Sequence, residues 1–540
     1  MKTSFSICKI LFTLLTTLCI YTNIHAQPNI QHSIYFQEKY CLDSFFVRPF
    51  YTLEHSKGSR FMIYGDRTPD SLNQYSESVR FAKLKSNSWD TLWTKLYNGP
   101  DEDILKFIKE LPNGNLLLAG HTSSDDGGIL YGYPFKSREI WLMEVDTFGT
   151  RIKTKCIGGG NGSELVDLSI STDGFIYFAG NTIANDYDFA HLALGGWGAA
   201  WIAKYDTAFN KVWIKVIDGD GEEGWPSIKE VTPERFVVGF MSSSTDTSSV
   251  PLEAKGMFDL IVHYIDSSGS IIWKHRYGGT NDDGTSGFSV VDPVSKDLYF
   301  INRSSSFATG DITHWSGTCW ILKIDTFGNI KGSKSYGAAT DYTWTDDALW
   351  YENKLWVIAH STGGGGDMEP ADQVATTNAW IGVFDSSTNL VAKYTLRTKY
   401  SDYFTDAFFF KNELFLNGLI LSDTIHAFSC DTSNKAMGFV VKPGLSPLGI
   451  NDIRQSAESI FDVYPIPTSQ NLILNISSQY HGDHAELKVY NVDGSVVYKK
   501  KIKAINQKEV IECSNWKSGN YVVQLTINKK ITASKQFIKQ

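Results

Sequence analysis

The segment WLMEVD, residues 141–146, recurs along this chain in recognisably similar copies. Related segments begin at Trp201 (WIAKYD), Trp320 (WILKID) and Trp380 (WIGVFD), and the same interval reaches Phe81 (FAKLKS), Ile261 (IVHYID) and Phe439 (FVVKPG). Successive copies start 59 or 60 residues apart. A fixed period of this length is the signature of a repeat architecture, so the repeat unit decides the fold.

Two further apolar segments recur with the same period. One ends in glycine and reads WTKLYNG from Trp93, WIKVIDG from Trp213 and WKHRYGG from Trp273, with weaker copies at Ile152 and Ile330. The other ends in a small or polar residue, as in LLLAG to Gly120, IYFAG to Gly180 and FLNG to Gly418. These segments are short and rich in Val, Ile, Trp, Tyr and Phe, which favours β-strands.

The repeat predicts a seven-bladed β-propeller over residues 27–446. Four strands in about 60 residues, repeated seven times, are typical of such a fold. Seven units of 60 residues also equal the 420 residues of this region. Asn113-Gly114 and Asp173-Gly174 stand where a tight turn needs positive φ angles. No convincing helical period interrupts this region.

The ends of the repeat predict how the ring closes. The copy at residues 439–442 has no later strands, and the segments 34–40, 45–53 and 60–65 have no first strand before them. Together they are expected to make one blade, which would leave no open sheet edge. Cys41 and Cys430 flank this shared blade, where they either form a disulfide or remain two buried thiols.

The amino end is expected to be a secretory signal peptide, residues 1–26. Lys2 and Lys9 precede an apolar run from Ile10 to Tyr21, and cleavage is expected after Ala26. The run is too short for a comfortable membrane span, and no transmembrane segment is expected in the mature chain. The five cysteines left after cleavage are widely spaced, which disfavours a zinc site or a disulfide-dense scaffold.

The charge excludes one class of partner. The net charge is −9 overall, but the signal contributes +2 and residues 461–540 contribute +5, so residues 27–460 carry −16. A nucleic-acid partner is therefore not expected. Neutral glycans, cations and basic proteins remain as possible partners. Seven of the 15 tryptophans lie on repeat strands, so much of the aromatic content is architecture.

The carboxyl end departs from the repeat. Residues 447–460 are expected to be a linker, and residues 461–540 to form a small β-sandwich of short alternating strands. Their motifs are VYPIPT from Val463, VYNVDG from Val489 and GNYVV from Gly519, followed by KQFIK from Lys535.

These motifs resemble the type A C-terminal sorting domain of the type IX secretion system. The residues that carry the resemblance are Tyr464, Pro465, Pro467, Gly494, Gly519 and Tyr521. Ile466 departs from the pattern, where the family usually has Asn. The resemblance implies handling by the type IX secretion machinery and secretion to, or display on, the surface of a Gram-negative bacterium. It further implies removal of the domain and attachment to surface lipopolysaccharide.

The repeats themselves resemble propeller repeats often found beside such sorting domains. They share the D-x-x-G turn after the Trp strand, as at Asp325–Gly328, and a G-x-T-x-S loop, as at Gly120–Ser124. No single activity comes with that resemblance.

Acidic clusters are the first candidates for chemistry. Carboxylate pairs follow the glycine-ending strands, at Asp101–Asp103, Glu222-Glu223, Asp282-Asp283 and Asp346-Asp347. Paired carboxylates suit glycoside hydrolysis. However, these pairs recur in several units, whereas an enzyme needs one catalytic pair and a structural turn is needed in every unit. We therefore predict a structural role and no catalytic residue among them.

Further acids lie in the loops after the strands of the third kind, and they could bind calcium or be solvated turns. The acids are Asp125, Asp126, Asp186, Asp188, Asp246, Asp311 and Asp367, and the amide of Asn185 lies beside them. None matches the spacing of a known calcium loop. No cofactor is predicted beyond this possibility of calcium.

Residues that break the repeat are better candidates for a ligand site. These are His191, Trp197, Trp225, His314, Trp315 and Trp344. Exposed indole rings stack on sugars or anchor protein partners; the alternative is that they pack between blades.

The sequence favours a surface-displayed binding or scaffolding module for a glycan or protein ligand. The alternative is a polysaccharide hydrolase or lyase with its site in the propeller channel. An enzyme predicts one unrepeated cluster of acids or histidines on the axis, whereas a binding module predicts an aromatic or polar rim.

Overall fold

The computed structural model describes residues 32–41, 51–69, 75–86, 88–97, 99, 101–124, 138–190, 198–245, 254–315, 317–339, 341–368, 377–396, 401–420, 437–447, 461–464, 468–476, 485–491, 495–502, 508–527 and 530–539. Within these ranges there is no α-helix, and Tyr187–Phe189 form a single 3₁₀ turn. The all-β prediction is confirmed. The expected signal peptide, Cys430 and nearly all of the expected linker lie outside the described residues.

In the part of residues 32–447 that the structure describes, there are seven antiparallel sheets of four strands each. Six of them contain four consecutive strands each. The first two sheets are β2 (Tyr51–Glu54), β3 (Arg60–Pro69), β4 (Tyr75–Leu84) and β5 (Thr91–Tyr97), followed by β6 (Asp103–Glu110), β7 (Leu116–Thr122), β8 (Glu139–Val145) and β9 (Arg151–Ile157). The next two are β10 (Ser163–Ile170), β11 (Ile176–Thr182), β12 (Ala199–Tyr205) and β13 (Lys211–Ile217), followed by β14 (Glu223–Thr232), β15 (Arg235–Ser242), β16 (Asp259–Asp266) and β17 (Ile271–Tyr277). The last two are β18 (Asp283–Val291), β19 (Leu298–Ser304), β20 (Cys319–Ile324) and β21 (Ile330–Tyr336), followed by β22 (Thr343–Tyr351), β23 (Lys354–Ser361), β24 (Asn378–Phe384) and β25 (Leu390–Leu396).

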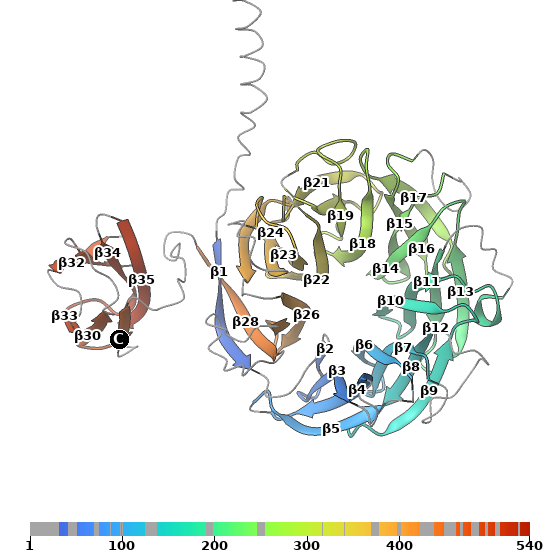
Figure 1. Ribbon diagram of the computed structural model, residues 1–540, viewed down its shortest axis with the longest axis horizontal. Coiled ribbons are helices and arrows are strands. Elements are labelled where there is room, and N and C mark those ends of the chain that lie inside the picture. Colours follow the sequence, from blue (N-terminus) through green and yellow to red (C-terminus); the bar gives the residue numbers. More distant parts are fainter. Residues whose placement is uncertain are drawn as a thin grey trace, which may run out of the picture.

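The seventh sheet joins the two ends of this region. Its order is β26 (Asp402–Phe410), β27 (Glu413–Ile420), β28 (Met437–Pro447) and β1 (His32–Cys41). β1 pairs antiparallel with β28 from His32 opposite Pro447 to Cys41 opposite Phe439. Figure 1 shows the sheets side by side around a common centre, with β6, β10, β14, β18, β22 and β26 toward the middle and β5, β9, β13, β17 and β21 toward the outside.

The predicted composition of the shared sheet is wrong in part. Of the three N-terminal segments, only residues 34–40 join β28; β2 and β3 pair with each other, and β3 pairs with β4 in a separate sheet. The reason is that the repeat period does not show which strand begins each sheet. The Trp segments are the third strands of their sheets, so β28 is also a third strand and its sheet lacks only a fourth, which β1 provides.

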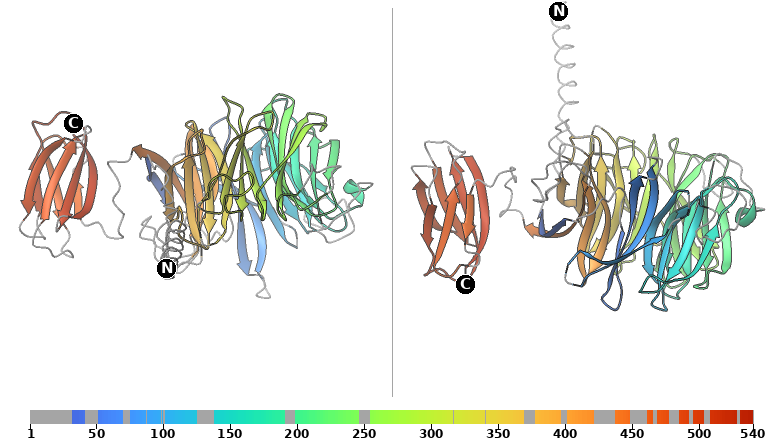
Figure 2. Two further views of the ribbon diagram at one scale, coloured as in Figure 1. Left: turned by 90° about the horizontal axis from the view of Figure 1, so that it is seen from above. Right: turned by 60° about the horizontal axis from the view of Figure 1, so that its bottom comes forward.

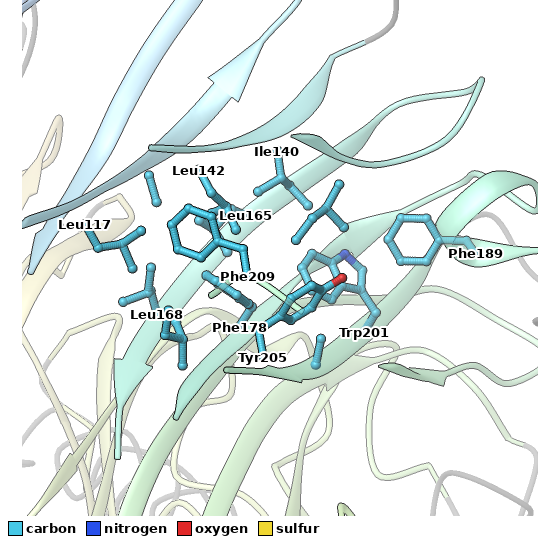
Figure 3. Packing of buried hydrophobic residues seen from close by; sticks show 14 of the residues in the cluster. Leu117, Ile140, Leu142, Leu165, Leu168, Phe178, Phe189, Trp201, Tyr205 and Phe209 are labelled. Atoms are coloured by element: carbon cyan, nitrogen blue, oxygen red, sulfur yellow. The ribbon is translucent and has the colours of Figure 1, made fainter. Parts of the chain in front are cut away.

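The repeated tryptophans are buried between sheets. Trp141, Trp201, Trp320 and Trp380 are each fully buried. Figure 3 shows Trp201 and Tyr205 of β12 among leucine side chains of the neighbouring sheet, such as Leu117 and Leu142. Burial of large apolar side chains between adjacent sheets is the main stabilising term of such a fold.

The glycine opposite two of these tryptophans has a packing reason. Trp141 pairs with Gly120 and Trp201 with Gly180, in register on the second strand. A Cβ atom at Gly180 would stand 2.6 Å from the Trp201 ring. The backbone of the first strand is closer still, because such a Cβ atom would stand 1.9 Å from the Glu164 carbonyl oxygen at Gly180 and 1.9 Å from the Ile104 carbonyl oxygen at Gly120. Close approach of the first-strand backbone therefore explains these two glycines.

Short turns join the strands at one edge of the ring, which we call the turn face. Gly114 and Gly174 have φ angles of +80° and +86°, as the sequence predicts. Turns of the Asp-x-x-Gly kind lie at the same face. In one of them, the Asp146 carboxylate accepts hydrogen bonds from the N–H groups of Phe148 (2.9 Å) and Thr150 (2.7 Å).

The opposite edge, the loop face, carries the longer connections between second and third strands. The described parts of these connections are residues 123–124 and 138, 183–190 and 198, 243–245 and 254–258, 305–315 and 317–318, and 362–368 and 377. Figure 2 shows the strands running between these two edges. The described parts of the longer connections therefore belong to one face of the molecule.

The carboxyl-terminal segment forms two further sheets. One contains β29 (Phe461–Tyr464), β30 (Asn471–Ile476) and β33 (Lys508–Glu512); the other has the order β32 (Val496–Ile502), β31 (Ala485–Asn491), β34 (Gly519–Ile527) and β35 (Lys530–Lys539). They enclose a core of their own that includes Leu472, Leu487, Val523 and Phe537.

Candidate functional site

The second acid of three carboxylate pairs has a structural role. Asp103, Glu223 and Asp283 are buried and begin β6, β14 and β18. Each accepts a hydrogen bond from the N–H of the glycine four residues earlier and from two hydroxyl groups at the end of the second strand. We call this arrangement the carboxylate clamp. The prediction that these acids serve the architecture agrees with this geometry.

The first acid of each pair is not used in the same way. Glu102 forms an ion pair with Arg138, with 3.1 Å between Oε2 and Nη2. Glu222 and Asp282 form no side-chain ion pair or hydrogen bond with any described residue. They are partly buried, and each lines a hollow on the loop face.

The larger hollow, which we call the Trp315 pocket, has a volume of about 640 Å³. It lies where four loop-face connections meet. Its lining residues are Met257, Thr280, Asn281, Asp282, Ser305, Phe307, Trp315, Thr318, Ala339, Asp341 and Tyr342. Pockets with an apolar wall and a few polar groups are the usual form of a ligand site.

Aromatic rings form one wall of the Trp315 pocket. The rings of Phe307 and Trp315 are 4.7 Å apart between centroids. Phe307 is 62 % exposed and Tyr342 38 % exposed, so apolar surface faces solvent at this point. Exposed aromatic rings grouped around a pocket are uncommon without a binding role.

A cation supports the Tyr342 ring of this wall. The Arg303 guanidinium lies 3.8 Å from the centroid of the Tyr342 ring and 5.0 Å from that of Trp344. Tyr342 and Trp344 meet edge to face with 6.0 Å between their centroids. This stack fixes the orientation of Tyr342 at the pocket wall.

Polar groups complete the pocket. Asn281 and Asp282 stand on the connection that enters β18, and the Asp341 carboxylate is held by the Tyr342 N–H (2.7 Å) and the Thr362 hydroxyl (2.5 Å). The pocket therefore presents ring faces beside oxygen and amide groups, which together match the apolar face and hydroxyl groups of a sugar.

The predicted ligand residues do not all lie together in the structure. His314 packs against Tyr336 with 5.8 Å between ring centroids, and it does not line the Trp315 pocket. Trp344 is partly buried behind Tyr342. His191 and Trp197 lie outside the described residues. Of the predicted set, Trp315 lines the Trp315 pocket and Trp225 lines a second hollow.

Trp225 lines a second hollow of about 330 Å³, which we call the Trp225 cleft. The indole is 42 % exposed, and Arg138, Asn161, Asn181 and Glu222 also line the cleft. Trp315 and Trp225 belong to different sheets, so the loop face has two aromatic hollows.

The inner strands β22 and β26 carry three acids that do not repeat in every sheet, and one of them pairs with a histidine of the second strand β23. His360 Nδ1 lies 2.8 Å from Oδ2 of Asp346, and its ring is 5.0 Å from the ring of Tyr403. Asp347 Oδ2 accepts from the Ala407 N–H at 2.9 Å, and Asp406 Oδ2 accepts from the Thr52 N–H at 3.2 Å. These last two bonds connect neighbouring sheets.

The environment raises the pKa values of these carboxyl groups. Burial raises the pKa of Asp347 to about 6. Burial, together with the charge of Asp347, raises the pKa of Asp406 well above its usual value. Burial also raises the pKa of Asp346, against the stabilising effect of His360. Perturbed acids of this kind occur both in active sites and in structural networks.

Four of the acids considered as calcium ligands accept hydrogen bonds from backbone N–H groups. One is Asp186, which accepts from the Gly160 N–H at 2.8 Å. Asp188, Asp311 and Asp367 accept hydrogen bonds from the N–H groups of Gly158 (3.3 Å), Gly278 (3.1 Å) and Gly337 (3.1 Å). Among the described residues, no three His, Cys, Asp or Glu side chains are grouped so as to hold a metal ion. Asp125, Asp126 and Asp246 lie outside the described residues.

Sequence reasoning missed several residues of the Trp315 pocket. Tyr342 occupies the position that holds the first acid in other units, and Phe307 lies in an insertion. Aligning the units would have revealed the change at position 342. The role of Arg303 depends on contact between neighbouring sheets, for which the sequence has no local signal.

The carboxyl-terminal sheets place the motif residues at their strand ends. Tyr464 pairs with Ile473, and Gly519 pairs with Lys539 at the start of β34. Tyr521 is buried and its hydroxyl donates to the Lys517 carbonyl at 2.7 Å. Pro465, Pro467 and Gly494 lie outside the described residues.

The segment with this geometry matches a family model described as the secretion system C-terminal sorting domain, over residues 462–540. Residues 462–540 are a type IX sorting domain. The sorting domain indicates secretion or attachment at the cell surface. The part of the chain that the structure describes has no helix long and apolar enough to cross a membrane.

No curated protein matches this chain in sequence. Among solved structures, it is similar to a fungal alcohol oxidase of the AA5 family in complex with copper, at 11 % identity and a TM-score of 0.42, with 94 % of this chain and 99 % of that one covered. A DUF4221 member from Bacteroides vulgatus is 10 % identical, with a TM-score of 0.39 and coverages of 78 % and 99 %. An α-L-arabinanase from Penicillium chrysogenum complexed with arabinobiose is 12 % identical, with a TM-score of 0.38 and coverages of 67 % and 99 %. Likenesses this distant carry no argument about the chain.

Proposed function

We propose that this protein is an exported glycan-binding module displayed at the bacterial surface. Residues 27–446 form a closed seven-bladed β-propeller, residues 447–460 a linker, and residues 461–540 the sorting domain recognised by the type IX machinery. Residues 1–26 are the signal peptide. The ligand binds in the Trp315 pocket of the loop face.

The closure of the propeller is supported by contacts between the two ends of the repeat region. β1 completes the sheet of β28, and Asp406 of β26 bonds to the backbone of Thr52 in β2. Both contacts join residues more than 350 positions apart. Pairing of the terminal strands would hold the ring shut without a disulfide.

The observation that carries the binding proposal is the aromatic wall of the Trp315 pocket. Phe307, Trp315 and Tyr342 present ring surface beside the carboxylate of Asp282, which is not engaged by any described residue. A sugar offers C–H groups to the rings and hydroxyl donors to the carboxylate. The acidic charge of residues 27–460 favours a neutral glycan over an anionic one.

An array of immobilised neutral polysaccharides, including arabinan, xylan and laminarin, tests this proposal. We expect the wild type to bind at least one of them. Trp315→Ala and Asp282→Asn should each weaken binding about tenfold, the usual effect of losing one stacking or charged hydrogen-bond contact. Phe327→Ala is the matched control, because Phe327 is 76 % exposed at the turn face.

Two results would contradict the proposal. One is unchanged binding in Trp315→Ala and Asp282→Asn variants that keep the wild-type thermal midpoint. The other is an array with no glycan signal and a stable complex with a protein ligand instead, which would assign the module to protein recognition.

A polysaccharide hydrolase or lyase is the second candidate. The Asp346–His360 pair and the neighbouring Asp347 and Asp406 favour it, because they combine three acids of the inner strands β22 and β26, whose carboxyl pKa values are raised, with a histidine of the second strand β23. Asp347 and Asp406 also have structural partners in the next sheet. A turnover screen on the arrayed polysaccharides decides between the candidates. Turnover that His360→Ala abolishes would favour the enzyme, and binding without turnover would count against it.

A further inference from the structure

Trp225 departs from the repeat in its backbone. In β6, β10, β22 and β26 a single residue is looped out of the pairing with the second strand, at positions 106, 166, 346 and 405. In β14 the unpaired residues are Trp225 and Pro226, which lie between Gly224 and Ser227 and opposite Phe240 of β15, so the net insertion is again one residue. β18 has the same arrangement between Thr285 and Phe288. The bulge is therefore common to these strands, and Trp225 differs from its counterparts in backbone conformation rather than in the number of residues.

The conformation of Trp225 is unfavourable for a large side chain. Its φ angle is +52°, in the left-handed region that glycine adopts readily. The Asn181 side chain holds this conformation by accepting a hydrogen bond of 2.9 Å from the Trp225 N–H. Strained residues persist where the surrounding structure fixes them, and they cluster at binding sites.

The cost of this conformation is not recovered in the core. The indole is 42 % exposed, and Trp225 belongs to none of the buried apolar clusters of the described residues. The ring instead lines a cleft of about 330 Å³ with Asn161, Asn181, Arg138 and Glu222. These groups offer hydrogen-bond donors and acceptors around one aromatic face.

We propose that the Trp225 cleft is a second sugar-binding subsite, in which the indole stacks on a pyranose or furanose ring. Glu222 accepts from sugar hydroxyl groups, and the amides of Asn161 and Asn181 and the guanidinium of Arg138 complete the polar side. Like Asp282 in the Trp315 pocket, Glu222 stands directly before a clamp carboxylate and forms no side-chain ion pair or hydrogen bond with a described residue.

The two hollows together would bind one polysaccharide at two points. This inference rests on the proposed glycan binding by the Trp315 pocket. Both hollows lie on the loop face, and attachment at a second point raises the affinity for a polymer without changing the affinity for a short oligosaccharide that fills one hollow. The partner is thus a polymer longer than the reach of a single pocket.

The test uses Trp225→Gly in the full chain. Glycine removes the ring and relieves the left-handed strain, so the thermal midpoint should stay the same or rise. Titration calorimetry is done with arabinan, xylan and laminarin as polymers and as disaccharides. We expect Trp225→Gly to weaken binding of the recognised polymer about tenfold or more, and to leave disaccharide binding unchanged. Trp225→Phe should retain much of the polymer affinity, and Phe327→Ala should match the wild type.

Each result bears on the inference. Equal polymer affinity in wild type and Trp225→Gly overturns the second subsite while leaving the Trp315 pocket intact. A fall in the thermal midpoint together with an equal loss of polymer and disaccharide binding assigns Trp225 a structural role. Wild-type protein that binds none of the three polymers but binds a protein ligand overturns both this inference and the proposed function.

Discussion

Replacing the clamp carboxylate of Asp283 tests the packing of the loop face. Asp283 is fully buried at the start of β18. Its carboxylate accepts hydrogen bonds from the Gly279 N–H (2.5 Å) and from the hydroxyl groups of Ser304 (2.5 Å) and Ser306 (2.8 Å). Asp283→Ala leaves three donors without this acceptor.

The structure sets the size of the effect. A buried donor that loses its acceptor costs roughly 1–3 kcal/mol, and hydroxyl groups can turn to find another partner. Burial raises the pKa of Asp283, so removing the carboxylate also recovers part of its desolvation cost. We expect a net loss of about 3 kcal/mol in the free energy of unfolding at neutral pH.

The repeat provides matched variants. Glu223 holds the same place in β14, with Gly219, Ser242 and Ser244 in place of Gly279, Ser304 and Ser306. Asp283→Glu should therefore cost less than about 1 kcal/mol, because a longer acid is accommodated by an equivalent set of donors. Asp266→Ala is the control for loss of a hydrogen-bonded acid at the turn face, where water replaces its contacts with Ser268 and Ser270.

Urea unfolding followed by tryptophan fluorescence measures these differences. All but one of the 15 tryptophans, Trp516, precede residue 461, so the signal reports the repeat region. The reasoning is refuted if Asp283→Ala costs no more than Asp266→Ala. It also fails if Asp283→Glu is as damaging as Asp283→Ala.

Two further predictions concern pH and export. Burial raises the pKa of Asp347 to about 6, so the folded state holds this proton more tightly than the unfolded chain, where the pKa is about 3.9. The wild type should therefore lose about 1–2 kcal/mol of stability as the pH rises from about 4 to about 6. Urea unfolding midpoints measured across this pH range should decline less steeply in Asp347→Asn than in the wild type. Equal pH dependence of the midpoint in the two proteins would refute the assignment. Deleting residues 461–540 should leave the protein in the periplasm, as measured by cell fractionation with surface labelling; normal surface display without them would contradict the role of the sorting domain.

Strand positions could be predicted because their signals are local. Alternating apolar residues, turn glycines such as Gly114 and Gly174, and the constant spacing of Trp141, Trp201, Trp320 and Trp380 are all visible within one unit. The strand that begins each sheet could not be identified in the same way. The same period is obtained whichever strand is counted first, and only the pairing of β2 with β3 and of β1 with β28 fixes the boundary.

The ligand site shows the same division. The sequence indicated Trp315 and Trp225 because they break the repeat, and both line hollows. It also indicated His314 and Trp344, which pack behind other side chains. Sequence reasoning has no means of separating these cases, because exposure depends on the side chains of a neighbouring sheet.

By itself, the sequence determined the all-β class, the repeat of about 60 residues, the sorting domain and the structural role of the clamp acids. Each of these depends on residues close together in the chain, or on a motif that is complete within one segment. Only the tertiary structure decided that Phe307, Trp315 and Tyr342 share a pocket, and that Arg303 lies against Tyr342. Such contacts join different sheets, and their geometry is set by how the sheets pack around a common centre rather than by any local pattern.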